Sequence, residues 1–169
     1  MFFRHIEYVQ FQGISFTSEI IKKFTGGNDS HSAVLDREAP DPTKPLIEQW
    51  PHNGGIKAWM GYSEWESHSK GTPCQVWSLK VPADDYDWIM GQYRSAAERR
   101  EEYDWSGIIS FFGIGKEDPN KTFCSEIMFK YLAERKGWSR TDPSKVHPSK
   151  FGDILEMIGA KLTPAREYV

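Results

Sequence analysis

The pattern of hydrophobic and polar positions predicts short strands in the first half of the chain and helices mainly in the second half. Residues 31–35 and 46–50 are short, mostly apolar runs with a Pro-rich loop between them. Residues 75–81 place Gln, Trp, Leu and Val at every second position, which is the spacing of one face of a strand. We therefore expect three strands here, preceded by an extended segment over residues 7–16 that turns near Gly13.

Four segments have the spacing or the end signals of helices. A short helix is expected over residues 17–24, with two glycines as its stop, and a longer one over residues 84–102. The clearest helix begins near Cys124, because apolar residues recur there at i, i+3, i+4, i+7 and i+8, and Gly137 ends it. A final helix is expected over residues 148–158.

Two stretches have no clear period. Residues 51–73 are rich in glycine and aromatic residues, and we interpret them as a long loop or lid. Residues 105–115 are apolar and flanked by glycine. The length fits one domain that buries a core without disulfides or metals. We expect an α+β domain over residues 1–169, in which a small antiparallel sheet or incomplete barrel packs against the helix that begins at Cys124.

Composition narrows the classes of function. Hydrophobic residues make up 38% of the chain and charged residues 27%, the balance of an ordinary globular domain. The net charge of -3 argues against a nucleic-acid partner, which requires a concentrated basic surface. No apolar run approaches the roughly 20 residues of a membrane span, and the first residues lack the features of a secretion signal. With only two cysteines, we expect a reduced, cytoplasmic setting, whereas the oligomeric state is not predicted.

Cys124 is the first candidate for chemistry, because it stands in the first turn of its predicted helix. Unpaired backbone N–H groups at a helix N-terminus, together with a nearby imidazolium, lower the pKa of a thiol from about 8.5 to between about 3.5 and 7.5. A thiol held in this way is a nucleophile. The alternative interpretation is a buried and inert cysteine that packs as a small hydrophobic residue.

His31 and Glu48 are the candidates that would complete such a site. His31 opens a strand of small residues, a rigid mount for a general base, whereas His52 and His68, which spacing alone does not exclude, lie in the irregular segment. Glu48 lies in mid-strand among apolar neighbours, where an unpaired carboxylate is costly, so we expect it to orient the imidazole of His31. The competing interpretations are a structural histidine and a carboxylate that faces solvent from an edge strand.

Other chemistries have less support. A phosphate-binding loop fails because Gly115-Lys116 is followed by Glu117 instead of serine or threonine. The cysteines and histidines show neither C-x-x-C nor H-x-x-x-H spacing, so we expect no zinc site, and no cofactor is predicted. The G-x-S-x-G elbow of serine hydrolases is absent. Three tryptophans, Trp50, Trp59 and Trp65, are candidates to line a groove.

Several short motifs together resemble the circularly permuted papain-like enzymes of the NlpC-type superfamily, in particular the YiiX-like branch. The matching stretches are residues 13–26 running into Ser30-His31-Ser32-Ala33-Val34, then Leu46-Ile47-Glu48, Tyr103-Asp104, Phe123-Cys124-Ser125-Glu126 and Pro148-Ser149. They cover nearly the whole chain. Histidine precedes cysteine here, which is the reverse of the papain order.

The resemblance implies a cysteine hydrolase of the amidase or peptidase class with a Cys124–His31–Glu48 triad, acting on a small peptide-like or acyl substrate. The backbone N–H of Cys124 and the hydroxyl of Tyr103 would stabilise the oxyanion. We expect Trp50 and Ser125 to contact substrate.

One position departs from the family pattern. Unpermuted relatives that cut cell-wall peptides carry aspartate at the position of Phe123, which argues against cell-wall specificity. Permuted relatives similar to lecithin:retinol acyltransferase move acyl groups between lipids, so a lipid-directed acyltransferase or phospholipase is the alternative enzyme. The third reading is a catalytically silent binding module.

Overall fold

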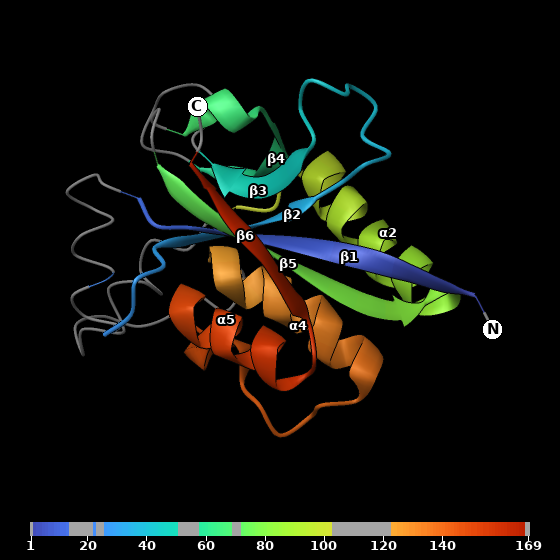
Figure 1. The fold of residues 1–169 in the computed structure, drawn as a ribbon. Helices are drawn as coiled ribbons and strands as arrows, with labels where there is room; N and C mark the ends of the chain where they lie inside the picture. The colour runs from blue at the N-terminus through green and yellow to red at the C-terminus, as the bar shows by residue number, and fades with distance from the viewer. Residues whose placement is uncertain are drawn as a thin grey trace.

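An antiparallel sheet of six strands forms the centre of the computed structural model, which describes residues 2–13, 22, 26–50, 58–68, 72–102 and 123–167. The strands are β1 (Phe3–Phe11), β2 (His31–Leu35), β3 (Leu46–Trp50), β4 (Trp59–Ser63), β5 (Pro73–Pro82) and β6 (Lys161–Glu167). Their order across the sheet is β4-β3-β2-β1-β5-β6, and every neighbouring pair is antiparallel (Figure 1). Consecutive strands β1 to β4 thus form a meander, to which β5 and β6 are added beside β1.

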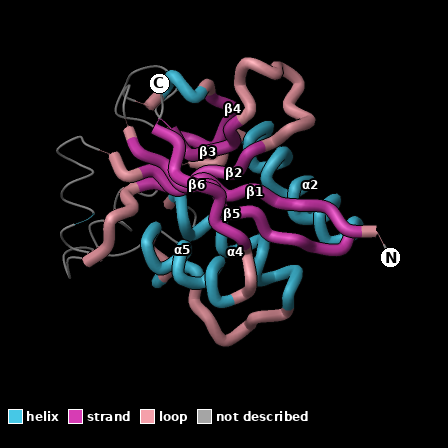
Figure 2. Tube along the Cα trace, viewed as in Figure 1, coloured by secondary structure: helices cyan, strands magenta, loops and turns pink. Residues whose placement is uncertain are grey.

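Three helices among the described residues cover one face of this sheet (Figure 2). They are α2 (Ala83–Arg99), α4 (Cys124–Lys136) and α5 (Pro148–Met157), and two 3-10 turns, η1 (Trp65–Ser67) and η2 (Pro143–Lys145), connect other elements. Helix α4 packs on β2 and α2, while α5 packs on β1 and β5. The α+β class with a small antiparallel sheet is therefore confirmed.

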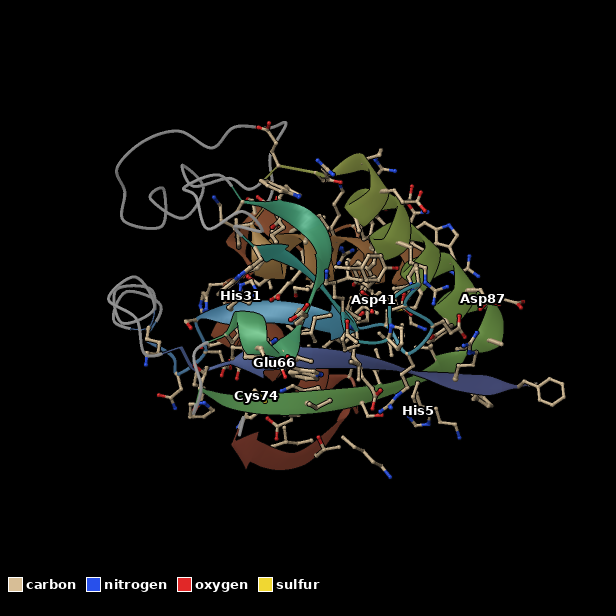
Figure 3. The ribbon with its side chains drawn as sticks, turned by 90° about the horizontal axis from the view of Figure 1, so that it is seen from above. His5, His31, Asp41, Glu66, Cys74 and Asp87 are labelled. Carbon is tan, nitrogen blue, oxygen red and sulfur yellow. The ribbon has the colours of Figure 1, made fainter. Side chains whose placement is uncertain are left out.

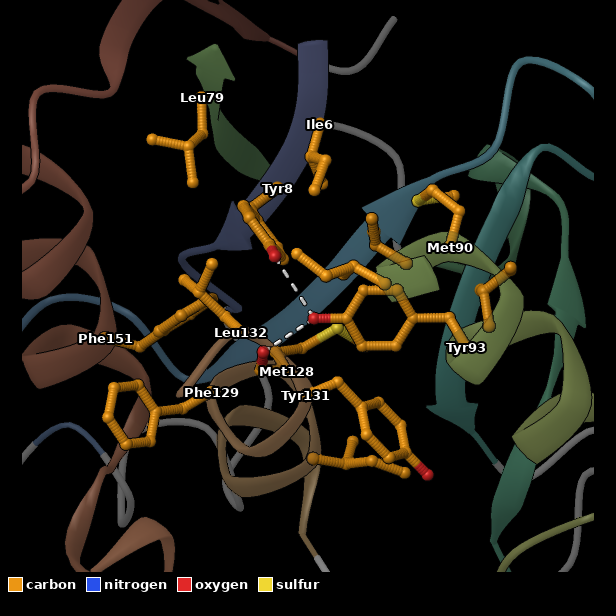
Figure 4. Packing of buried hydrophobic residues seen from close by; sticks show 14 of the residues in the cluster. Ile6, Tyr8, Leu79, Met90, Tyr93, Met128, Phe129, Tyr131, Leu132 and Phe151 are labelled. Atoms are coloured by element: carbon orange, nitrogen blue, oxygen red, sulfur yellow. Dashed lines mark hydrogen bonds between the residues drawn. The ribbon is translucent and has the colours of Figure 1, made fainter. Parts of the chain in front are cut away.

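The main core lies between the sheet and the helices, and a chain of buried phenols crosses it (Figure 4). The hydroxyl groups of Tyr8 on β1 and Tyr93 on α2 are 3.2 Å apart, and Tyr93 donates to the carbonyl of Met128 on α4 at 2.6 Å. Burial raises the pKa of both phenols, so they remain neutral. This chain links the sheet to two helices, one of which carries Cys124.

A buried carboxylate fixes the far end of β2. Asp36 is fully buried and accepts two hydrogen bonds from Arg94 of α2, at 2.8 and 2.7 Å, and one from the Tyr62 hydroxyl of β4 at 2.9 Å. Burial raises the pKa of Asp36, but the hydrogen bonds from Arg94, the backbone of Glu38 and Tyr62, together with the charge of Arg94, outweigh burial, so the pKa lies below its ordinary value. Asp36 thereby joins α2 to the end of β2 and to β4, the two strands that flank β3.

Most of the elements expected from the sequence are present. Strands 31–35 and 46–50 have the expected bounds, the strand expected over 75–81 lies inside β5, and the three later helices are confirmed within a few residues. Left-handed residues end two of them, Arg100 at φ 53° and Gly137 at φ 70°.

Other expectations need correction or lie outside the description. The interpretation of residues 51–73 as a loop or lid is wrong, because β4 and η1 lie within them, and β6 was not expected. Both strands owe their stability to pairing with β3 and β5, which the local pattern does not reveal. The helix expected over 17–24 falls, except for residue 22, outside the described residues, and so does the stretch 105–115.

Candidate active site

The candidate site lies where the sheet opens between β2 and β3. Strand β1 pairs with β2 from His31 to Leu35, whereas β3 pairs only with Val34 and Leu35. The first half of β2 therefore leaves backbone groups on its β3 side for another partner. Helix α4 supplies that partner, because it packs on β2 and the backbone N–H of Ser32 donates to Cys124.

Cys124 is the first residue of α4, and it is 2% exposed. The helix begins after Phe123, whose backbone N–H donates to the carboxylate of Glu126 at 3.2 Å, one half of a capping box. Phe123 and Ala58 bury the thiol in a small apolar cluster. Burial raises the pKa of Cys124, but the positive charge of His31 and hydrogen bonds from His31 and the backbone of Ser32 and Ser125 outweigh it. The pKa of the thiol is therefore lowered, as a helix N-terminus also favours.

His31 stands between the thiol and a carboxylate. Its Nε2 atom is 2.7 Å from Oε2 of Glu48. Because an ionised carboxylate can only accept, Nε2 carries the proton, and Nδ1 is left for the hydrogen bond that His31 makes with Cys124. Burial lowers the pKa of His31, but the Cys124 thiolate and Glu48 outweigh burial and raise it to about 10. The favoured state is thus a thiolate–imidazolium pair.

Glu48 is fully buried in the middle of β3, between β2 and β4. Besides the contact with His31, its carboxylate accepts a hydrogen bond from Ser63 of β4 and lies 3.0 and 3.3 Å from Nε2 of His68. Burial raises the pKa of Glu48, but the charge and hydrogen bonds of the two histidines outweigh burial and hold the pKa well below its ordinary value. The carboxylate is therefore ionised, and its interior position is compensated by donors on three sides.

Aromatic rings pack around His31 and His68, on the sheet face to which Phe11 and Trp50 also point. The Phe11 ring stacks on His68 with centroids 3.6 Å apart, and Trp50 lies 5.5 Å from His31 and 4.4 Å from His68. Figure 3 shows His31 near one end of the sheet and His5, an unrelated histidine of β1, toward the other. The rings limit the movement of both imidazoles near Glu48.

The structure brings together the three residues chosen from the sequence as a triad. Cys124, His31 and Glu48 form one continuous hydrogen-bonded series, and the partly buried Trp50 lies beside His31. The interpretation of Glu48 as a solvent-facing edge residue is wrong, since β4 covers that side of β3.

The two remaining predictions concern Ser125, expected to contact substrate, and Tyr103. The side chain of Ser125 is fully buried, and its hydroxyl donates to the carbonyl of Val146 at 2.7 Å. The hydroxyl thus holds α4 to the segment after η2, and its position gives the substrate-contact prediction no support. Tyr103, expected to stabilise an oxyanion, lies outside the described residues.

Sequence reasoning missed the role of His68 and Ser63. The sequence presents His68 only as an alternative base, because residues 51–73 show no clear period. The 3-10 turn η1 directs the chain back after β4, and His68, the residue that follows it, is 6% exposed. A usable signal was present, because Trp59, Gly61 and Ser63 alternate with Met60 and Tyr62 as they would in a strand.

In the described part of the chain, one group of side chains could serve as metal ligands. Ligand atoms of His31, Glu48 and His68 all lie within 4.8 Å of one another. The fold assembles them from three separate segments, which is why sequence spacing gave no zinc signal. The contacts of 2.7 and 3.0 Å are, however, direct hydrogen bonds between the carboxylate and each imidazole. A zinc ion would have to replace both, at about 2.0–2.2 Å from each ligand atom.

Comparisons with protein-family models, with curated proteins and with solved structures give no match to this chain. Among the described helices, none has both the length and the apolar character needed to cross a membrane.

Proposed function

We propose that the protein is a cysteine hydrolase of the amidase or peptidase class, with a fold of the permuted papain-like type. One observation carries the proposal: the imidazole of His31 joins a carboxylate on one side to a thiol of lowered pKa at a helix N-terminus on the other. A merely structural cysteine does not require a buried ionised partner, whose desolvation is costly. Nucleophile, base and orienting group in hydrogen-bonded series are the signature of covalent catalysis.

The chemistry would run in two steps. The Cys124 thiolate attacks the carbonyl carbon, and the negative charge on oxygen is stabilised at the helix N-terminus, where the backbone N–H of Cys124 has no intrahelical acceptor. The C–N bond then breaks, and the amine leaves with the proton of the His31 imidazolium. Neutral His31 next takes a proton from water, which attacks the thioester, releases the acid and restores the thiolate–imidazolium pair. Glu48 keeps the ring oriented and stabilises its charged form.

Within the described part of the chain, the distribution of exposed apolar groups favours an amide over a lipid substrate. Among the described residues, the large apolar side chains most open to solvent are Phe2, Phe3, Met157 and Leu162. They lie at the start of β1, at the end of α5 and on β6, away from the segments that carry the triad. An enzyme that takes acyl chains from a lipid surface needs an apolar rim beside its nucleophile. Because the exposed apolar side chains lie away from the triad, the lipid-directed acyltransferase is the second candidate function.

Alkylation of Cys124 tests the proposal without a known substrate. The second thiol, Cys74, is buried in a separate apolar cluster with Val9 and Phe11, so the background is Cys74→Ala. We expect the rate of reaction with iodoacetamide to titrate below the free thiol pKa of about 8.5. His31→Ala should move this pKa upward and slow alkylation at neutral pH by about tenfold or more, because burial is then opposed only by the backbone N–H groups of Ser32 and Ser125 and the helix N-terminus. A thiol that titrates near the free value, indifferent to His31→Ala, would contradict the proposal.

Mass spectrometry of the intact protein then identifies the acyl donor. Peptide amides, cell-wall peptide fragments and phospholipid vesicles are presented separately, and the mass added to Cys124 is recorded. A thioester from a peptide supports the amidase, whereas one from phospholipid replaces it with the lipid enzyme. Cys124→Ser serves as the control for non-covalent adducts.

A further inference from the structure

We propose that His68 is a positioning residue of this site: its Nε2–H holds the Glu48 carboxylate in the orientation that serves His31. The proposal rests on the proposed function and goes beyond a three-residue site. Both imidazoles approach the same oxygen of Glu48, His31 at 2.7 Å and His68 at 3.0 Å. The ionised carboxylate accepts from both, so His68, like His31, carries its proton on Nε2.

The setting of His68 is rigid. It follows η1 immediately, and its backbone N–H donates to the carbonyl of Trp65 at 3.1 Å, which closes the turn. Its ring lies nearly parallel to that of Phe11, with 11° between the planes, and its side chain is 5% exposed. A histidine packed in this way cannot follow a moving carboxylate, so the carboxylate is fixed to it.

The division of donors around Glu48 explains why a second histidine is useful. His31 must change its charge during catalysis, so its hold on Glu48 varies through the cycle. Ser63 donates to the other oxygen, Oε1, and gives a single neutral hydrogen bond. Among the described residues, the Nε2–H of His68 donates to Glu48 and not to the reacting thiol. This hydrogen bond therefore stays in place while the charge of His31 changes. In the ranges that the structure describes, the titratable groups that face Glu48 are these two histidines, on β2 and after η1.

Loss of the hydrogen bond from His68 should affect Cys124 indirectly, through Glu48 and then His31. Without His68, the buried carboxylate keeps its charge less readily and stabilises the His31 imidazolium less. The thiolate then loses its counterion. We expect the effect to be visible as a higher apparent pKa of Cys124, even though His68 does not touch the thiol.

The test compares His68→Gln with His68→Asn in the Cys74→Ala background. Glutamine carries an amide N–H at about the reach of Nε2, whereas asparagine, one methylene shorter, places it at about the reach of Nδ1. We expect His68→Gln to alkylate within about threefold of the parent at pH 7, and His68→Asn about tenfold more slowly, which corresponds to roughly one unit in the pKa of Cys124. His5→Asn is the control, since His5 is an exposed histidine bonded to Ser78. It should leave the profile unchanged.

Each outcome decides the question. Equal pH profiles for His68→Asn and His68→Gln would overturn the positioning role, while a continued response to His31→Ala would show that the proposed function still stands. If the parent itself titrates like a free thiol, it is the proposed function that fails. Thermal unfolding of each variant separates loss of fold from loss of positioning, because a purely structural role lowers the Tm without moving the pKa of a folded protein.

Metal analysis of the purified parent completes the test. We expect no stoichiometric zinc and no change in alkylation after chelation. Stoichiometric zinc that disappears in both His68 variants would overturn the proposal, because it would make His68 a ligand.

Discussion

At the scale of residues, Glu48 holds the site together. A fully buried carboxylate is costly unless donors surround it, and here two histidines and a serine do so. The ionised state of Glu48 in turn raises the pKa of His31, and His31 lowers that of Cys124. The reactivity of the thiol therefore depends on a group that it does not contact.

Glu48→Gln tests this dependence, since the amide keeps the size of the side chain and removes its charge. We expect the apparent pKa of Cys124 to rise and its alkylation at pH 7 to slow by about tenfold, one pKa unit being a factor of ten. Glu64→Gln is the matched control, because Glu64 follows β4 directly and is 46% exposed in a long-range ion pair of 3.9 Å with Lys44. Similar profiles for the two variants would exclude the carboxylate from the activation of Cys124.

The pH dependence of turnover should be bell-shaped. On the acid side the thiolate is lost as the pH falls through the lowered pKa of Cys124. On the alkaline side the His31 imidazolium, whose pKa is about 10, loses the proton that the leaving amine requires. Initial rates from pH 4 to 11 on any substrate found in the mass-spectrometric screen measure both limbs. A rate that keeps rising above pH 10 would contradict the assignment of His31 as the acid.

At the scale of elements, the ion pair of Asp36 and Arg94 holds the meander on α2, and its removal should be costly. Arg94→Leu leaves the fully buried Asp36 charge without its main partner. We expect a loss of about 2–3 kcal/mol, below the usual range for a broken buried pair because Arg94 is 30% exposed. Urea denaturation measures it. Arg99→Leu, on the same helix but in an exposed pair with Glu101 at 3.6 Å, should cost less than about 1 kcal/mol.

The elements also show how far the sequence can predict this structure. Strands 31–35 and 46–50 and the helix at Cys124 were predicted because each carries its own signal, a short apolar run or a 3.6-residue period ended by glycine. The strand at 59–63 was missed because the glycines and aromatic residues around it hide its alternation. Three residues of the site are thus predicted from their own segments, whereas the role of His68 is not, because its placement depends on β4 and η1 and the alternation over residues 59–63 is a weak signal.

At the scale of the whole molecule, stability should fall in acid. Glu48 and Asp36 have lowered pKa values in the folded state, so each contributes stability that is complete above the ordinary carboxyl pKa of about 4 and is lost as the pH falls through the folded value. His31 has a raised pKa, so its contribution is complete below about 6.5 and is lost as the pH rises toward 10. Urea midpoints should therefore be highest between about pH 4 and 6.5, where all three contributions are complete. A midpoint that stays constant from pH 7 to 2 would contradict the acid limb.

The pairing of β1 with both β2 and β5 has a consequence for the newly made chain. Phe11 sits opposite His31 on one side and Cys74 on the other, so the centre of the sheet joins segments far apart in sequence. Cys124 comes later still, and it meets His31 only when α4 packs on this sheet. Contacts of such long range form slowly, because long loops must close before the contacts can stabilise the chain. Until then Cys124 is an ordinary thiol with an ordinary pKa, and the chain acquires its reactive group only as folding is completed.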